Sequence, residues 1–468
     1  MTKKRLIEST ESCIANGGNN KSLKLLPMTF DEVAAIIQSG DSEKLREIIE
    51  AGRVCDINMI KDHKSLLMLA CESSFIECAR ILLDYKADVN YTCFDESVLK
   101  CSCLSGNSNI LRVIIDRGVI VTDKDLAALF DLNEIARNTE ISTVLLGYIQ
   151  NVNWDGSGES FLFIACKAGN ATVVRALLER GARLGSVEYD PLEVASRNGH
   201  VEVVTVLLGH YTSEGPDCQE RICDSLLSAS NHGYVDIVRA LISHSSTAST
   251  YALNNSLFQA VKGHHVEVAA ALLDAGADFS ALVRDVLARR RAFDYDEVWS
   301  AWIYACRQGR PDMVRLLLAR GADPNPVRAI GKSPLEAALL HPEAMRVLLE
   351  HGADPNRLLY DGSTALQDLV RYKRGDYIQA ITTLLGHGAD PNMADPRTGE
   401  TILMIAALEL NVDLVKLLLE HGADVTQVNQ AGRSVLDMLG RTRKYGEVVK
   451  LCTSYIDSNK PGAKQVLK

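Results

Sequence analysis

The 468-residue sequence lacks any long hydrophobic run. Its longest stretch without Asp, Glu, Lys or Arg, residues 240–261, is rich in Ser, Thr and Asn, whereas a membrane-spanning helix needs about 20 mainly apolar residues. We therefore expect no membrane insertion. Lys3, Lys4 and Arg5 are not followed by an apolar segment, so we also expect no secretory signal.

An excess of positive charge is missing as well. Lys and Arg total 50 and Asp and Glu total 60, which gives a net charge of −10. Because binding to nucleic acid needs a basic footprint, we expect no nucleic-acid partner. Aromatic residues make up only 6%, but hydrophobic residues reach 47%, enough for a packed core, which excludes general disorder.

Motifs that support catalysis or metal binding are absent. The chain has no Cys-x-x-Cys, His-Glu-x-x-His or Gly-x-Ser-x-Gly. Gly331-Lys332-Ser333 resembles the end of a phosphate loop, but Pro326 stands where that loop needs glycine. We interpret the 12 cysteines as reduced thiols and the 11 histidines as structural. We therefore expect no enzymatic activity, no cofactor, no metal and no small-molecule substrate.

What the sequence does contain is a repeated unit. A residue suited to a helix N-cap is followed two positions later by an anchor residue and five positions later by a small residue. The cap positions are Ser65, Ser97, Ser160, Asp190, Asp224, Asn255, Ser300, Ser333, Thr364, Thr401 and Ser434. The anchor is Leu in ten units and Trp302 in the other, so we expect it to be buried. Successive caps are mostly 30–37 residues apart.

Each unit continues with the apolar spacing of a second helix, such as Val201, Val204 and Leu207 on one helical face. Glycine can close such a helix because it adopts the left-handed conformation. Glycines at the expected ends are Gly181, Gly276, Gly321, Gly352, Gly388 and Gly422. Asp-Pro-Asn then follows at residues 323–325, 354–356 and 390–392 and predicts a turn.

This unit resembles the ankyrin repeat, in which a capped first helix, a second helix and a Gly-Ala-Asp-x-Asn loop recur about every 33 residues. The clearest copies lie at residues 333–356, 364–392 and 401–426, and we count about thirteen units within residues 30–456. The resemblance implies an all-α solenoid of stacked repeats, elongated and curved. Each repeat would comprise a helix-turn-helix and an extended, β-hairpin-like loop.

Several segments depart from this pattern. We expect residues 1–29 to form a disordered basic segment and residues 457–468 a flexible tail. A 63-residue gap after Ser97 predicts a degenerate unit near residues 119–151, the weakest part of the stack. A 45-residue gap after Asn255 predicts an insertion near residues 283–299, whose four Arg and four acidic residues favour an extended second helix with internal salt bridges over an anion site. The family's Thr-Pro-Leu-His tetrapeptide is complete nowhere, so we expect uneven stability along the stack.

The resemblance places partner binding on the concave face, built from loop tips and first helices. First-helix positions in that register hold Glu72, Lys167, Arg197, Asn231, Lys262 and Arg307. We interpret the four basic residues among them as a ladder that binds an acidic or extended peptide. The alternative is that they serve solubility.

Aromatic residues at the loop tips are further candidates, because aromatic side chains are enriched in binding hot spots. These residues are Tyr91, Phe94, Trp154, Tyr189 and Tyr360. We select Trp154, Tyr189 and Tyr360 as partner-binding. A turn at residues 155–156 makes the Trp154 ring hard to bury locally, and packing onto a neighbouring loop is the alternative.

These features predict a non-catalytic scaffold or adaptor, cytoplasmic or nuclear, that binds a partner protein or extended peptide on its concave face. The alternative is a substrate-recognition subunit of a cullin-type ubiquitin ligase. Val448, Cys452 and Ile456 fit a degenerate version of the box that recruits elongin, but would equally fill the last second helix. Asparagines at the loop position that a hydroxylase modifies in ankyrin repeats are Asn90, Asn325, Asn356 and Asn392.

Overall fold

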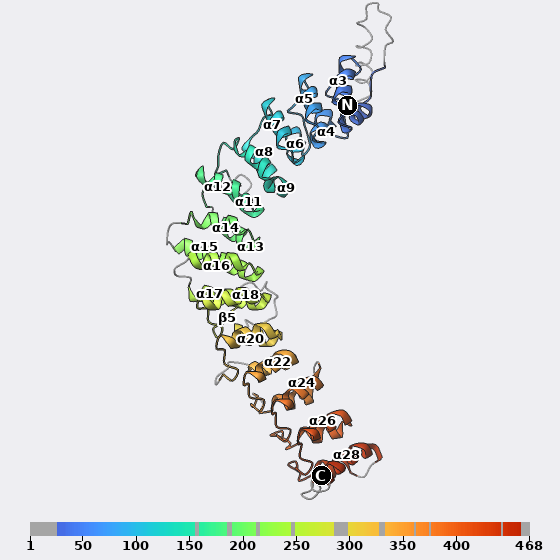
Figure 1. The fold of residues 1–468 in the computed structure, drawn as a ribbon, viewed down its shortest axis with the longest axis vertical. Helices are drawn as coiled ribbons and strands as arrows, with labels where there is room; N and C mark the ends of the chain where they lie inside the picture. The colour runs from blue at the N-terminus through green and yellow to red at the C-terminus, as the bar shows by residue number, and fades with distance from the viewer. Residues whose placement is uncertain are drawn as a thin grey trace, which may run out of the picture. The chain divides into compact units, whose positions relative to one another are not determined.

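The fold consists of consecutive helix pairs (Figure 1). The computed structural model describes residues 26–154, 159–184, 190–211, 216–244, 249–284, 298–326, 333–359, 362–373, 376–440 and 443–459. Within these ranges we find thirteen helix pairs, the number that the sequence predicts. The chain divides into two compact units, residues 1–213 and residues 214–468. The all-α repeat fold is therefore confirmed.

The first unit holds six pairs and one additional short helix. Its helices are α2 Phe30–Gln38, α3 Ser42–Glu50, α4 Leu66–Glu72, α5 Ile76–Asp84, α6 Val98–Leu104, α7 Ser108–Asp116, α8 Asp123–Phe130, α9 Asn133–Arg137, α10 Thr139–Leu146, α11 Phe161–Ala168, α12 Ala171–Glu179, α13 Pro191–Arg197 and α14 Val201–Leu208. Two hairpins precede first helices, β1 Ile60–Lys61 with β2 Lys64–Ser65, and β3 Thr92–Cys93 with β4 Glu96–Ser97.

The second unit holds the other seven pairs. Its helices are α15 Pro216–His232, α16 Val235–His244, α17 Thr250–Gly263, α18 Val266–Asp274, α19 Ala301–Gln308, α20 Pro311–Ala319, α21 Pro334–Ala337, α22 Pro342–Glu350, α23 Ala365–Tyr372, α24 Tyr377–Gly386, α25 Ile402–Leu408, α26 Val412–Glu420, α27 Val435–Leu439 and α28 Gly446–Asn459, with a 3-10 turn at Arg443–Tyr445. One further hairpin pairs β5 Leu282–Arg284 with β6 Val298–Ser300.

Helix capping explains where most first helices begin. Nine of the eleven predicted caps accept a hydrogen bond from a first-turn N–H, as Ser65 does from Met68 and Thr401 does from Met404. A cap of this kind stabilises a helix by about 1 kcal/mol. The anchor residues that follow are buried, apart from the half-buried Leu436. Small residues behind them, such as Ala70 and Ala406, are fully buried between neighbouring helices.

Two predicted caps are wrong, because Asp224 lies inside α15 and Asn255 lies inside α17. Both first helices begin earlier in the sequence, and Ser249 caps α17 by accepting from the Ala252 N–H. Periodicity locates the correct helix here but not its start. In these two repeats the residues that precede the predicted cap form additional helical turns, whereas in the other repeats the corresponding residues belong to a loop.

The degenerate region contains three short helices in place of two. The chain breaks after α8, and α9 packs against α11 while α10 packs against α7 and α12. Leu126, Phe130, Ile135 and Ile141 are buried there, so the region joins the common core. Its stability relative to the other repeats stays a prediction.

The insertion does not extend a second helix, so that prediction is wrong. Helix α18 ends at Asp274, and residues 282–284 form strand β5, which pairs with β6 in an antiparallel register. The remaining insertion residues, 285–297, lie outside the described residues, as do 1–25 and 460–468 of the two predicted terminal segments. Helix α28 continues to Asn459.

Candidate functional site

The hairpins of the first unit have strained tips. In the β1–β2 hairpin both turn residues, Asp62 and His63, have positive φ values of 49° and 70°. In the β3–β4 hairpin Phe94 has a φ of 53°. The left-handed region costs an L-residue about 1–2 kcal/mol. His63 stands two residues before its helix cap, the place that Gly399 fills in the second unit with a φ of 69°.

The tips of the β1–β2 and β3–β4 hairpins touch each other. The rings of His63 and Phe94 lie 4.8 Å apart, edge to face at 89°. Such pairs are worth about 0.5–1.5 kcal/mol beyond burial. The Phe94 side chain is nevertheless 86% exposed, the most exposed large hydrophobic residue that the structure describes. Ile60 on the adjoining hairpin is 52% exposed. The hairpins therefore present an aromatic residue that contacts a neighbouring ring and is otherwise largely exposed to solvent.

Ion pairs surround the hairpins. Lys61 pairs with Asp31 at 2.6 Å across a repeat boundary. Lys64 pairs with Glu72 at 2.6 Å, and Lys100 pairs with Glu96 at 2.9 Å. The surface is thus polar and close to neutral rather than basic.

Glu72, Glu96 and Cys101 place potential ligand atoms within 4.8 Å of one another. Each carboxylate already has a lysine partner, and burial raises the pKa of the Cys101 thiol to about 12. Metal binding to sulfur requires the thiolate. The donor set therefore fits an internally paired structural cluster better than a metal site.

The predicted basic residues of the first unit are both paired with carboxylates. Lys167 lies 3.2 Å from Glu159, and Arg197 lies 3.5 Å from Glu193 on the same helix. Helices α11 and α13, which carry the two basic residues, pack against each other. This brings Lys167 and Arg197 onto adjacent helices, but as charge-balanced pairs.

In the second unit, Lys262 on α17 and Arg307 on α19 are both exposed. These two helices also pack against each other, with the Phe258 and Tyr304 rings 5.0 Å apart between them. Each unit therefore contributes its own pair of basic residues on adjacent first helices.

The loop-tip aromatics differ from the expectation. The Trp154 ring lies 6.0 Å from the Phe161 ring and is half-buried, so the argument that local packing cannot cover it is wrong. The first residue of the following helix supplies the covering surface. Tyr189 and Tyr360 lie outside the described residues. Phe94, the loop-tip aromatic that the selection left out, lies at the turn between the paired strand residues Cys93 and Glu96 and is 86% exposed.

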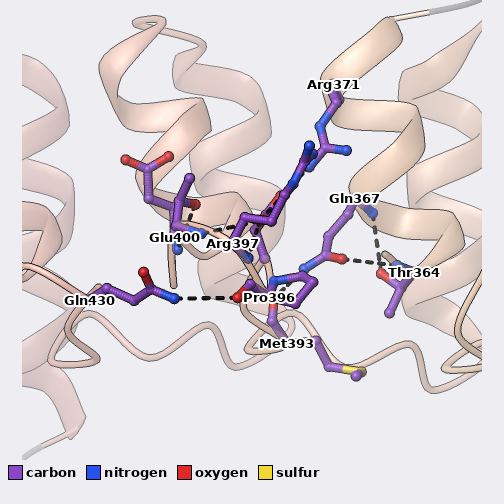
Figure 2. A network of polar contacts seen from close by, with 10 residues as sticks. Thr364, Gln367, Arg371, Met393, Pro396, Arg397, Glu400 and Gln430 are labelled. Carbon is purple, nitrogen blue, oxygen red and sulfur yellow. Dashed lines mark hydrogen bonds and ion pairs between the residues drawn. The ribbon is translucent and has the colours of Figure 1, made fainter. Parts of the chain in front are cut away.

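A polar network orders the loop at residues 390–400 in the second unit (Figure 2). Asp395 is 5% exposed, forms an ion pair with Arg371 and accepts backbone N–H bonds from Arg397 at 2.7 Å and Thr398 at 3.2 Å. Burial alone would raise the pKa of Asp395. The two backbone bonds, together with the guanidinium groups of Arg371 and Arg397, more than offset that effect and lower its pKa below the ordinary value.

Gln367 and Gln430 attach this loop to the repeats on either side. The Gln367 amide donates to the Met393 carbonyl at 2.8 Å, while its oxygen accepts from the Thr364 N–H at 2.9 Å. Gln430 donates to the Pro396 carbonyl at 3.3 Å. Gln367 occupies the position of the family's histidine in Thr-Pro-Leu-His. The missing tetrapeptide is therefore replaced here by another hydrogen-bonding side chain.

Loop asparagines form a second kind of tie between repeats. Asn356 accepts from the Asp390 N–H at 2.7 Å and donates to the Gly388 carbonyl at 3.0 Å. Asn325 and Asn392 make the same two bonds one repeat earlier and one repeat later. In the first unit, Asn90 accepts from the Ile120 N–H. These side chains hold the loop tips in register.

A family model described as "Ankyrin repeats (3 copies)" matches residues 33–125, 132–222, 281–358 and 366–461, together well over half of the sequence. The chain is an ankyrin-repeat protein. Ankyrin repeats are generally protein–protein interaction modules, and proteins built from them are generally non-enzymatic. Among the described residues of this ankyrin-repeat protein, no helix combines the length and apolar character needed to cross a bilayer.

Two curated relatives show what this ankyrin-repeat protein is similar to. It is 28% identical to "Ankyrin repeat and KH domain-containing protein mask-1" of Caenorhabditis elegans over 171 residues, and this aligned segment is 36% of the chain. It is 26% identical to "Ankyrin repeat and KH domain-containing protein CBG24701" of Caenorhabditis briggsae over 268 residues, and this aligned segment is 56% of the chain. The matches span only 6% and 7% of those much longer proteins.

Proposed function

We propose that this protein is a non-catalytic adaptor that holds a partner protein or extended peptide on the face formed by its hairpins and first helices. The observation that carries the proposal is Phe94, a residue that is 86% exposed and has a backbone φ of 53°. An exposed phenyl ring adds little to folding, and the left-handed backbone opposes it. Strain that persists against stability is concentrated at functional positions.

The surroundings of Phe94 support this role. Protein interfaces combine a few aromatic anchors with a polar rim. The pairs Lys61–Asp31 and Lys100–Glu96 supply such a rim. Because both charges of each pair are present, a partner gains selectivity from charge matching rather than from a net positive field.

The predicted basic residues keep a secondary place in this proposal. Lys167 and Arg197 act as rim contacts, since a partner carboxylate must compete with Glu159 and Glu193 for them. Lys262 and Arg307 serve the second unit in the same way. Of the selected aromatics, Trp154 offers only its uncovered part, and Tyr189 and Tyr360 remain candidates from the sequence. We place the protein in the cytoplasm or nucleus, where its free cysteines stay reduced.

The burial of α28 argues against the ligase alternative. Val448 and Cys452, the core of the box that would recruit elongin, are both 0% exposed on α28, which packs against α26 and α27. An elongin subunit could reach them only if α28 left the stack, which would expose the end of the core.

The experiment is affinity capture of the tagged full chain from native lysate, with bound proteins quantified by mass spectrometry. Phe94→Ala should reduce capture of a specific partner about 30-fold, the effect of losing about 2 kcal/mol at a hot spot. Val201→Ala, which removes a 41% exposed apolar side chain from second helix α14, is the matched control and should leave capture unchanged.

Equal capture by the wild type and Phe94→Ala would contradict the anchor. If the partner were lost instead from a Lys167→Glu, Arg197→Glu double variant, the binding site would move to the basic residues of α11 and α13.

A further inference from the structure

Cys93 and His63 form a nucleophile–base pair on the hairpins of the first unit. The Cys93 Sγ lies 3.4 Å from the His63 Nδ1, within reach of a hydrogen bond to sulfur. The two residues come from successive hairpins, 30 positions apart, so the repeat itself brings them together. An adjacent imidazole is the arrangement that converts a cysteine thiol into its reactive thiolate.

The local structure holds this pair in place. The Phe94 and His63 rings are in contact, with their centroids 4.8 Å apart and their planes at 89°. The backbone of His63 is fixed in the left-handed region, and the Cys93–Glu96 register pair closes the second hairpin. Tyr91 adds a second polar contact, because burial and a hydrogen bond with Cys93 both raise the pKa of its hydroxyl. A hydroxyl that donates to sulfur favours the thiolate.

Four other cysteines lie in a different environment, inside the core. Burial raises the pKa of Cys101 and of Cys103 to about 12, and it raises those of Cys166 and Cys306 well above the ordinary value. These thiols are packing groups that stay protonated. Cys93, by contrast, is half-buried at a hairpin that faces solvent. It therefore combines access with a base.

We propose that Cys93 is a modification site for small disulfides and other soft electrophiles, with His63 as its general base. His63 Nδ1 takes the thiol proton, and the thiolate attacks one sulfur of a disulfide such as oxidised glutathione. The S–S bond breaks, a mixed disulfide forms on Cys93, and the leaving thiolate takes the proton from the imidazolium. The disulfide is both electrophile and oxidant. This site does not depend on the proposed partner surface.

The test measures the rate of Cys93 modification in the reduced full chain at pH 7 with oxidised glutathione, and in parallel with iodoacetamide. Cleavage after Lys and Arg places Cys93 alone in residues 87–100 and the exposed Cys55 alone in residues 54–61, so one digest reports both. An ordinary thiol is about 3% ionised at pH 7. With His63 as its general base, Cys93 should react about tenfold faster than Cys55.

Three variants make the test specific. His63→Asn, which tolerates the left-handed backbone, should lower the Cys93 rate about tenfold and leave Cys55 unchanged. Tyr91→Phe should lower the Cys93 rate by a smaller factor, about threefold. Asp62→Asn, at the neighbouring turn position, should change neither rate. The proposal is overturned if Cys93 reacts no faster than Cys55 in the wild type, or if neither His63→Asn nor Tyr91→Phe slows it.

Discussion

The side-chain oxygen of Asn356 accepts a hydrogen bond at 2.7 Å from the backbone N–H of Asp390, which is 34 residues away in the next repeat. The amide nitrogen of Asn356 donates to the Gly388 carbonyl at 3.0 Å, so both ends of one side chain are used. These two bonds attach the loop tip at Asn356 to the loop of the next repeat, in addition to the hydrogen bonds within its own turn.

Asn356→Ala should destabilise the second unit by about 1–3 kcal/mol, because a backbone donor and a backbone acceptor both lose their partner. Urea unfolding would measure the loss, and hydrogen exchange should show faster exchange at the Asp390 amide. The control is Gln379→Ala, which removes an exposed amide side chain from α24. Equal effects of the two variants would contradict the tie.

The ion pair of Asp395 predicts a pH dependence. Because the folded-state pKa lies below its ordinary value, its contribution is complete above the unfolded-state pKa of about 3.9 and is lost as the pH falls through the lower folded value. Asp395→Asn should cost about 1–3 kcal/mol at pH 7, and the difference from the wild type should shrink as the pH drops from 5 towards 2.

Urea unfolding at several pH values would check this behaviour. Glu420→Gln at the exposed end of α26 is the control and should show little effect at any pH. A difference between Asp395→Asn and the wild type that stays constant down to pH 2 would mean that the carboxylate charge plays no part.

Two glycines in the same repeat separate backbone strain from steric clash. Gly169 and Gly181 have φ values of 82° and 83°, but a Cβ at Gly169 would lie 2.6 Å from the His200 ring, whereas one at Gly181 would meet nothing within 4 Å. Gly181→Ala should cost about 1–2 kcal/mol and Gly169→Ala about 1–3 kcal/mol more. Adding His200→Ala should recover part of the extra cost in thermal unfolding. Identical losses in the two single variants would refute the clash.

Two variants at Asp62 measure the backbone strain at the β1–β2 turn. With a φ of 49°, Asp62→Gly should be more stable than Asp62→Ala by about 1 kcal/mol, because glycine lacks the Cβ that strains alanine in this region. Both variants remove the same carboxylate, so each serves as the control for the other. A higher melting temperature for the alanine variant would show that the turn is not strained.

The repeat pattern predicts most of the fold because each signal is local. A cap such as Ser65 and a buried anchor such as Leu67 depend on residues within one turn of helix, and both predictions are confirmed. The sequence does not predict the starts of α15 and α17. Any polar residue at the repeat spacing resembles a cap, and both helices begin before the cap position that this spacing indicates.

The candidate site was harder to predict because it depends on contacts between repeats. The Arg197–Glu193 pair follows from helical spacing, but the Lys167–Glu159 pair spans a loop and a helix. The contact between Cys93 and His63 needs the positions of two hairpin tips, although their separation of one repeat is a signal that sequence comparison between units could use.

The asparagine ties have a direction. Each side chain reaches forward, from Asn325 to Asp354 and from Asn392 to Asp424, and the series stops at Thr426, whose hydroxyl turns back to bind its own Asp424 at 2.7 Å. Removing a leading repeat would leave one backbone N–H and one backbone carbonyl without their asparagine partner, as at Asp354 and Gly352. Removing a trailing repeat would leave an asparagine side chain, such as that of Asn392, without either of its two hydrogen-bond partners. Truncation at either end therefore leaves one donor and one acceptor to water, and a repeat grafted behind the last one would need Thr426 replaced by asparagine to be tied to the stack.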